Sequence, residues 1–415
     1  MKGIFFAFLC FQMWVGSEMN FFIVPVFPVI AQKFNITGTL MGLILVFYGA
    51  AQVCSSITMM FIDFSKIKFH LFFMCTSLLI IGNLCFAFLE NLNFEAVLFF
   101  SFLGRIIHGT AEGVNLAVGF SLIAEVFPDQ VAKYIAIFES FNALIFVISP
   151  IFSGFLSEFT GYMNSYLIIS LIFLPSFFLI FYFSKRFKEI VPPNNDIETV
   201  PLTQEGDKKA YVLGTFKLLK KQEILLVLFM FAFHAMSCFM PDAGIYNHVK
   251  DIVGGNKFYL GTMLSTACFG TLIATFAFSY FIGKTKRKTF FIIGTSLIII
   301  YLLILGPEPY IFLEMQPWTI YLAFFIGGCS IFFASCAILP DFIETIRNET
   351  NIKNDIEIQD RASSLLSFGF SLGNIMGSLF GGIYIDIFGF TRAMTFQAGF
   401  ILIYTLIFAW RKKNV

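Results

Sequence analysis

The sequence has very little charge, because Asp, Glu, Lys and Arg make up only 13% of its 415 residues. Soluble domains carry about 25% charged residues. The formal net charge is +1, so no excess of basic residues points to nucleic acid as a partner. With 58% hydrophobic residues, the chain has more apolar surface than a water-soluble fold can bury. The lipid bilayer must therefore surround most of it.

Sequence motifs of metal sites and of phosphate chemistry are also missing. No HExxH pair and no phosphate-binding loop occurs. The eight cysteines form no CxxC pair and lie inside apolar stretches, which is typical of small buried hydrophobic residues rather than of disulfides or metal ligands. We therefore expect no enzyme activity, no metal and no cofactor.

What the chain does contain is a series of long apolar stretches separated by short polar links. A helix that spans a membrane needs about 20 residues. Twelve stretches reach or approach this length, and the first is too long to be a cleaved signal peptide. The predicted spans are 4–32, 38–62, 69–89, 95–125, 130–159, 161–183, 223–249, 257–283, 288–306, 316–344, 360–386 and 389–410.

Two of these stretches resemble each other. The segment 149–162 (SPIFSGFLSEFTGY) recurs 228 residues later as 377–390 (GSLFGGIYIDIFGF). A six-helix unit duplicated in tandem is typical of transporters whose halves rock around a central site. We therefore predict an all-α membrane protein with two pseudo-symmetric six-helix bundles, 1–183 and 223–415. They are joined by a polar cytosolic linker, 184–222.

The distribution of Lys and Arg predicts the orientation in the membrane. If the N-terminus is cytosolic, 22 of the 27 basic residues fall on the cytosolic side, four fall on the other side, and Arg105 lies inside a span. Both termini are then cytosolic, in a vesicular or plasma membrane. The sequon at Asn35 lies so close to the membrane that we expect it to stay unglycosylated.

Several ionisable residues fall inside predicted spans, where an isolated charge costs at least about 2.5 kcal/mol. In the fourth span, Arg105, His108, Glu112, Asn115 and Gly119 share one helix face. A cation, an imidazole and an acid on one face favour an internal cavity over lipid. The alternative is an Arg–Glu pair that only holds helices together.

Four further polar residues and one aromatic residue are candidates for the same cavity. Glu18 lies beyond the middle of the first span, Glu139 and Asn142 lie in the fifth, and Asp242 and Tyr246 lie near the outer end of the seventh. Glu139 is closer to the cytosolic end, where gating or capping is an equally good interpretation. A carboxylate in a partly dry cavity can hold either a proton or an ammonium group, and this competition is a mechanism for antiport.

Three segments resemble signatures of the major facilitator superfamily. The segment 61–68 is similar to the loop between its second and third helices. The segment 104–109 resembles a fourth-helix motif associated with proton coupling, and 149–154 resembles the fifth-helix antiporter motif with two glycines replaced by serine. The resemblance covers most of the chain and implies a transporter that works as a monomer.

Within that superfamily the sequence most resembles the vesicular amine and polyamine transporters. The segments 127–132, 149–162 and 305–309 carry this likeness. The family implies proton-coupled antiport of an organic cation. The sequence departs from it in the order Pro241-Asp242 and in having Ser367 where monoamine members have an acid, so a polyamine or another cation is favoured over a monoamine.

The residues therefore receive expected roles. Those expected to bind the substrate are Glu18, Asn142, Asp242 and Tyr246. Those expected to couple protons are Arg105, His108, Glu112 and Glu139. Those expected to gate the transporter, by latching the cytosolic side or by close helix packing, are Asp63, Lys66, Lys68, Pro150, Gly154, Gly381 and Gly382.

Two other functions stay open at this point. An organic-anion carrier would use Arg105 as the ligand, although the buried acids outnumber this one cation. A membrane scaffold that transports nothing would use the same residues only to hold its helices together.

Overall fold

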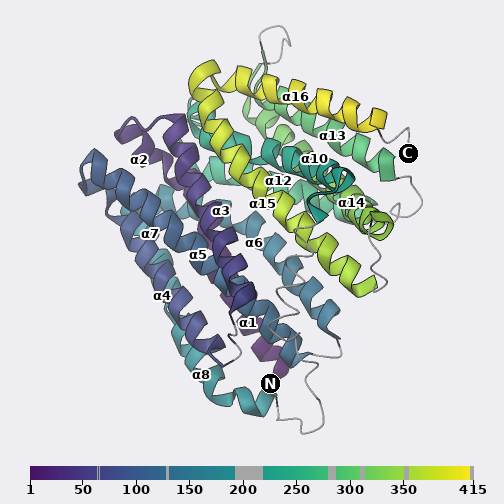
Figure 1. Cartoon of the computed structure of the whole chain (residues 1–415). Coiled ribbons are helices and arrows are strands. Elements are labelled where there is room, and N and C mark those ends of the chain that lie inside the picture. The colour runs from purple at the N-terminus through teal and green to yellow at the C-terminus, as the bar shows by residue number, and fades with distance from the viewer. Residues whose placement is uncertain are drawn as a thin grey trace. The chain divides into compact units, whose positions relative to one another are not determined.

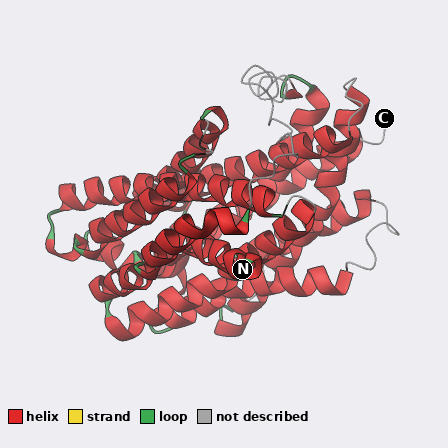
Figure 2. Cartoon of the chain, turned by 90° about the horizontal axis from the view of Figure 1, so that it is seen from below, coloured by secondary structure: helices red, strands yellow, loops and turns green. Residues whose placement is uncertain are grey.

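The computed structural model describes residues 1–62, 64, 66–127, 130–191, 218–278, 287–308, 314–349 and 355–411. Within these residues all regular structure is helical (Figure 2). The chain divides into two compact units. Unit 1 comprises Met1–Asn35 and Phe47–Ala210, and unit 2 comprises Ile36–Val46 and Tyr211–Val415.

Figure 1 shows the helices coloured in chain order. Helices of unit 1 are α1 (Lys2–Val26), α2 (Pro28–Lys33), α4 (Lys68–Ala87), η1 (Leu89–Asn91), α5 (Phe94–Val126), α6 (Val131–Thr160), α7 (Tyr162–Phe173) and α8 (Pro175–Ile190). Helices of unit 2 are α10 (Gln222–Phe239), η3 (Met240–Ala243), α11 (Ile245–Val249), α12 (Lys257–Phe278), α13 (Arg287–Leu305), α14 (Pro317–Glu349), α15 (Asp355–Phe388) and α16 (Phe390–Arg411). Helix α3 (Gly38–Phe61) begins in unit 2 and continues in unit 1.

In the part of the chain that the structure describes, ten helical segments are long and apolar enough to cross a membrane, and two shorter apolar helices cover 144–160 and 289–305. These segments coincide with the twelve predicted spans, so the prediction of a multi-pass, all-helical membrane protein is confirmed. The predicted linker differs at its start, because α8 continues to Ile190. Residues 192–217 of that linker lie outside the described part of the chain.

Prolines account for three breaks within predicted spans. The first span divides between α1 and α2 just before Pro28, the sixth divides just before Pro175, and the seventh passes into the short helix η3 around Pro241. A proline has no N–H to donate and its ring collides with the preceding turn, so a helix ends or bends there.

The sequence repeat returns in the backbone conformation. Gly161 lies between α6 and α7 with φ of 82°, and Gly389 lies between α15 and α16 with φ of 80°. The two glycines are 228 residues apart and occupy equivalent positions of the repeat. Only glycine adopts such a conformation without strain, so both halves turn between their fifth and sixth spans in the same way.

In unit 1, α4 packs against α5 and α7, while α1 packs against α5 and α6. The later part of α3 lies against α5, where a Cβ on Gly109 would fall 2.1 Å from the carbonyl oxygen of Tyr48. The small residues of α5 therefore let α3 and α5 approach closely. This close approach brings Tyr48 to the charged face of α5.

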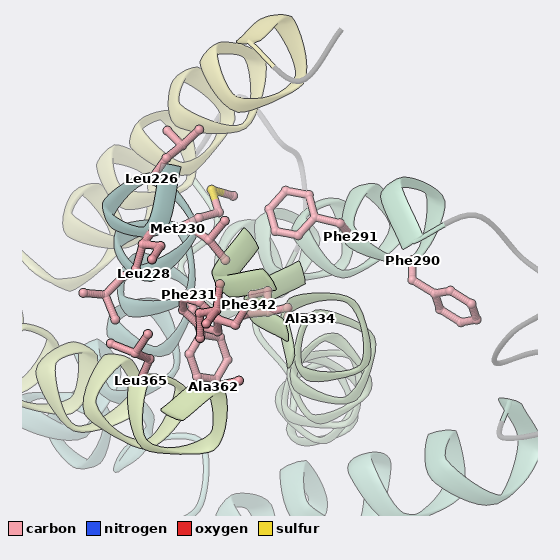
Figure 3. Close-up of a cluster of buried hydrophobic side chains, with 14 of the residues drawn as sticks. Leu226, Leu228, Met230, Phe231, Phe290, Phe291, Ala334, Phe342, Ala362 and Leu365 are labelled. Atoms are coloured by element: carbon pink, nitrogen blue, oxygen red, sulfur yellow. The ribbon is translucent and has the colours of Figure 1, made fainter. Parts of the chain in front are cut away.

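Unit 2 has a hydrophobic cluster to which α10, α12, α13, α14 and α15 contribute (Figure 3). Met230 and Phe231 of α10 meet Phe291 of α13, Phe342 of α14 and Leu365 of α15, and all five side chains are buried. This cluster holds α10, the helix that leads into Pro241 and Asp242, against its neighbours.

Candidate functional site

Arg105 of α5 is buried in unit 1, with 1% of its surface exposed. Its Nη1 donates a hydrogen bond of 2.8 Å to the carbonyl oxygen of Met19 on α1. Its guanidinium lies over the ring of Tyr48, 4.1 Å from the ring centroid. The predicted interior location of Arg105 agrees with these contacts, which join α5 to α1 and α3. A guanidinium on an aromatic face gains a cation–π attraction that grows as water is removed.

Glu112 lies two turns further along the same face of α5 and is 3% exposed. The hydroxyl of Tyr48 donates a short hydrogen bond to its Oε2. Tyr48 therefore contacts both the cation and the acid, with its ring on Arg105 and its hydroxyl on Glu112. The structure brings the two charged residues into one buried cluster through this tyrosine, which sequence reasoning missed.

Glu18 occupies a different environment on α1. Its side chain is fully buried, and neither carboxylate oxygen makes a hydrogen bond of regular geometry within the described residues. Trp14 and Ser149 face the carboxylate, but the Ser149 hydroxyl donates to the backbone carbonyl of Glu18 instead, at 3.1 Å. A buried carboxylate that faces only neutral groups is costly while it is charged, so Glu18 is a position where a proton or a cation would bind favourably.

His108 lies beside Arg105 on α5 but points to α4. Its ring stacks on Phe86, with centroids 5.7 Å apart and planes at 13°. A Cβ on Gly82 would fall 2.4 Å from the imidazole, so this glycine makes room for the ring. The imidazole interacts with Arg105 and with the backbone of Leu79.

A narrow space lies between Arg105, His108, Phe86 and Tyr166, and it is too small to admit a water molecule. In contrast, an apolar cavity of about 410 Å³ is lined by α1 and by Phe141 of α6. Phe6, Phe11 and Trp14 supply its aromatic wall. Trp14 is one helical turn from Glu18, so the wall of this cavity and the Glu18 carboxylate lie on neighbouring turns of α1.

Three further candidates lie on α5 and α6. Asn115 is buried and its amide donates 2.7 Å to the carbonyl oxygen of Gln12. Asn142 is half-buried, and its side-chain oxygen has no partner in the described residues. Glu139 lies within helix α6, but its side chain is outside the part of the chain that the structure describes.

In unit 2, Asp242 lies in η3 and is half-buried. Its electrostatic neighbours are Cys238 of α10 and Tyr301 of α13. Tyr246 follows on α11 and is buried. His234 is also buried and its Nε2 lies 3.4 Å from the Ser330 hydroxyl. The candidates of unit 2 therefore lie along α10 and its continuation past Pro241.

The predicted cytosolic latch is only partly described. Asp63 lies outside the described residues, and Lys66 is exposed in the turn before α4. Lys68 is buried at the start of α4 and forms an ion pair with Glu125 near the end of α5. In the structure, Lys68 therefore fastens two helices of unit 1 together.

The predicted packing residues lie in helix interiors. Pro150 is inside α6, where Gly154 is buried one turn later. A Cβ on Gly381 would fall 2.4 Å from the carbonyl oxygen of Met240, and one on Gly382 would fall 2.2 Å from that of Gly38. Both α15 glycines therefore permit close backbone contact, as small residues do between membrane helices.

Among the described residues no group of His, Cys, Asp and Glu side chains could hold a metal ion. The candidate site is thus built from carboxylates, one guanidinium, amides and aromatic rings. Such a set can bind protons and cations.

The model of the Major Facilitator Superfamily matches residues 3–349 of the chain. The chain belongs to this superfamily. It is therefore a multi-pass membrane transporter and not an enzyme.

Curated relatives agree with this assignment. The mouse (Mus musculus) MFS-type transporter SLC18B1 is 24% identical over 417 residues, covering 95% of this chain and 83% of the relative. The human (Homo sapiens) MFS-type transporter SLC18B1 is 23% identical over 417 residues, covering 96% of this chain and 86% of the relative. The resemblance to the vesicular amine and polyamine transporters agrees with these relatives.

Solved structures share the fold at low sequence identity. A bacterial homologue of the human lysosomal transporter Spinster superposes with a TM-score of 0.68 at 14% identity, covering 100% of this chain and 97% of that one. The nucleoside transporter NupG, as a D323A mutant, superposes with a TM-score of 0.70 at 12% identity, covering 97% and 99%. A POT family transporter in complex with 5-aminolevulinic acid superposes with a TM-score of 0.69 at 16% sequence identity, covering 98% of this chain and 95% of that one.

Proposed function

We propose that this Major Facilitator Superfamily transporter exchanges protons for an organic cation, an amine or a polyamine, by alternating access. The observation that carries the proposal is Glu18, a fully buried carboxylate that faces Trp14 and Ser149 but makes no hydrogen bond of regular geometry in the described residues. In the membrane such a group is stable when it holds a proton or a positively charged ligand. Competition between the two at one carboxylate couples proton flow to substrate flow in opposite directions.

The aromatic cavity near Glu18 is a second reason to propose a cationic ligand. Phe6, Phe11, Trp14 and Phe141 line it, and aromatic faces attract ammonium groups. In this proposal Glu18 and Asp242 bind the cationic head group, with Asn142 and Tyr246 as further contacts. The relatives named MFS-type transporter SLC18B1 also agree with transport of a small solute.

Glu112 takes part in proton coupling, and Arg105 and His108 adjust its environment. Tyr48 holds Glu112 through its hydroxyl and Arg105 through its ring. One Arg105 nitrogen bonds to the backbone of Met19 and the guanidinium lies on Tyr48, while its Nε has no hydrogen-bond partner in the described residues. The buried acids Glu18 and Glu112 outnumber this one guanidinium in unit 1, which favours a cation over an anion as the substrate.

The test is uptake into proteoliposomes with an imposed pH gradient, screened over putrescine, spermidine, a monoamine and a monocarboxylate. We expect the gradient to drive uptake of a cation, and Glu18→Gln to reduce that uptake at least about tenfold. The control is Glu95→Gln, an exposed acid in the first turn of α5, which should transport normally.

Uptake of the monocarboxylate but of no cation would identify an anion carrier instead. A scaffold that transports nothing would show no uptake, and Arg105→Ala and Glu112→Gln would leave its cellular phenotype intact. Normal cation uptake by Glu18→Gln would remove the basis of the proposal.

A further inference from the structure

The first turn of α3 is held by a carboxylate from the far end of the sequence. Asp386 of α15 accepts hydrogen bonds from the backbone N–H of Gly38 at 2.8 Å and from that of Thr39 at 2.7 Å. The Thr39 hydroxyl donates a third bond to Asp386, also of 2.7 Å. The first N–H groups of a helix have no partner within it, and a negative charge there is favourable. Asp386 therefore acts as a cap that another helix supplies.

The backbones of α3 and α15 touch next to this cap. A Cβ on Gly42 would fall 2.2 Å from the carbonyl oxygen of Ser378, and one on Gly382 would fall 2.2 Å from that of Gly38. Only residues without a side chain fit at these two positions. The contact is thus a built interface between the first half of α3 and the second half of α15, with Asp386 at its end.

Helix α3 is attached at two places. Residues Ile36–Val46 cluster with unit 2, and the chain from Phe47 clusters with unit 1. In unit 1 the attachment is buried, because Tyr48 bonds to Glu112 and lies on Arg105. Because α3 is one continuous helix with contacts in both units, any movement of one unit relative to the other must bend the helix or break its contacts at one end.

Of the two attachments of α3, the one at Asp386 has hydrogen bonds that bonds to water can replace. All three of its hydrogen bonds are exposed, so water can take over each partner as the bond breaks. The Tyr48 attachment is buried, and breaking it would leave polar groups without partners, which costs more. Helix α3 contains no proline that would give it a hinge.

We propose that Asp386 and the first turn of α3 form a releasable latch, closed in one state of the transport cycle and open in the other. This proposal rests on the proposed alternating-access function. The charge distribution of the sequence predicts that the latch lies on the side of the membrane opposite the cytosol.

A cross-link tests whether the latch must open. In the double variant Thr39→Cys with Asp386→Cys, oxidation should join the two positions and reduce transport at least about tenfold, and a reductant should restore it. The single variants under the same oxidation are the controls. If the fully cross-linked protein transports as fast as the same protein after treatment with the reductant, the proposal is overturned.

A second measurement needs no substrate and separates the latch from the proposed function. Ser378 is 2% exposed, so in a Ser378→Cys protein a maleimide should react slowly at position 378, measured by mass spectrometry of that peptide. Adding Asp386→Ala should speed this reaction about five- to tenfold, because three bonds that close the interface are lost. Adding Asp251→Asn, an exposed acid in the same unit, should not.

The outcomes are distinct. Faster labelling with Asp386→Ala supports the latch even if no transported cation is found. Unchanged labelling overturns it even if cation exchange is demonstrated. If Asp386→Ala fails to fold, Asp386→Asn, which removes the charge and keeps the size of the side chain, takes its place in the labelling measurement.

Discussion

At the scale of single residues, the buried polar groups of the site differ in the partners that they have. Tyr48 contacts Arg105 and Glu112 together, while Glu18 faces Trp14 and Ser149 without a hydrogen bond of regular geometry. Breaking the Tyr48 contacts should cost stability, whereas the Glu18 carboxylate is itself costly while it is charged. Changes at these positions should therefore affect stability and transport differently.

Tyr48→Phe removes the hydroxyl that donates a hydrogen bond to Glu112, and it keeps the aromatic ring against Arg105. A buried acceptor that loses its donor costs about 1–3 kcal/mol, so we expect lower thermal stability in detergent and weaker transport. Tyr259→Phe is the control, because Tyr259 is 51% exposed and water can satisfy its neighbours. Equal effects of the two variants would contradict the bridging role of Tyr48.

Gly82→Ala places a methyl group where a Cβ would fall 2.4 Å from the His108 ring. Overpacking of this kind costs about 1–3 kcal/mol, and the thermal midpoint of the purified protein should fall. Combining it with His108→Ala frees the space, so the double variant should lose less stability than the two single changes added together. Simple additivity would show that the two residues do not compete for this space.

At the scale of helices, the repeat determines where the chain turns. Gly161 and Gly389 hold equivalent positions with φ near 80°, and prolines begin α2 and α8. These local features end one helix and start the next without help from distant parts of the chain. Substitutions at the two glycines should therefore behave as a pair.

Gly161→Ala and Gly389→Ala should each lower stability by about 1–2 kcal/mol, because an L-residue is strained at positive φ. Gly399→Ala is the control. This glycine lies inside α16 with nothing within 4 Å of the added Cβ, so alanine should be neutral or stabilising by roughly 0.5–1 kcal/mol. Thermal midpoints of the three proteins give the comparison, and a stabilising effect at Gly161 or Gly389 would refute the backbone argument.

At the scale of the whole molecule, charge distribution predicts the orientation in the membrane. The loop around Gly254 lies between α11 and α12 and has open space around it, which suits it to carry an inserted tag. With an even number of spans, both termini share one side, and this loop lies on the other.

Protease protection in sealed vesicles with the cytosolic face outward tests this orientation. Tags at Met1 and Val415 should be digested, and a tag inserted after Gly254 should be protected until detergent is added. Protection of one terminus but not the other would mean an odd number of spans, and protection of both would mean the inverted orientation.

The sequence by itself determined the spans, the all-helical class and the shared face of Arg105, His108 and Glu112, because hydropathy and helical periodicity are local properties. It also determined the turns at Gly161 and Gly389 through the repeat. Only the tertiary structure decided the partners. Tyr48 meets Glu112 across 64 residues, Arg105 meets Met19 across 86, and Asp386 meets Gly38 across 348. Such pairs depend on how helices pack, and no local pattern in the sequence records which faces will meet.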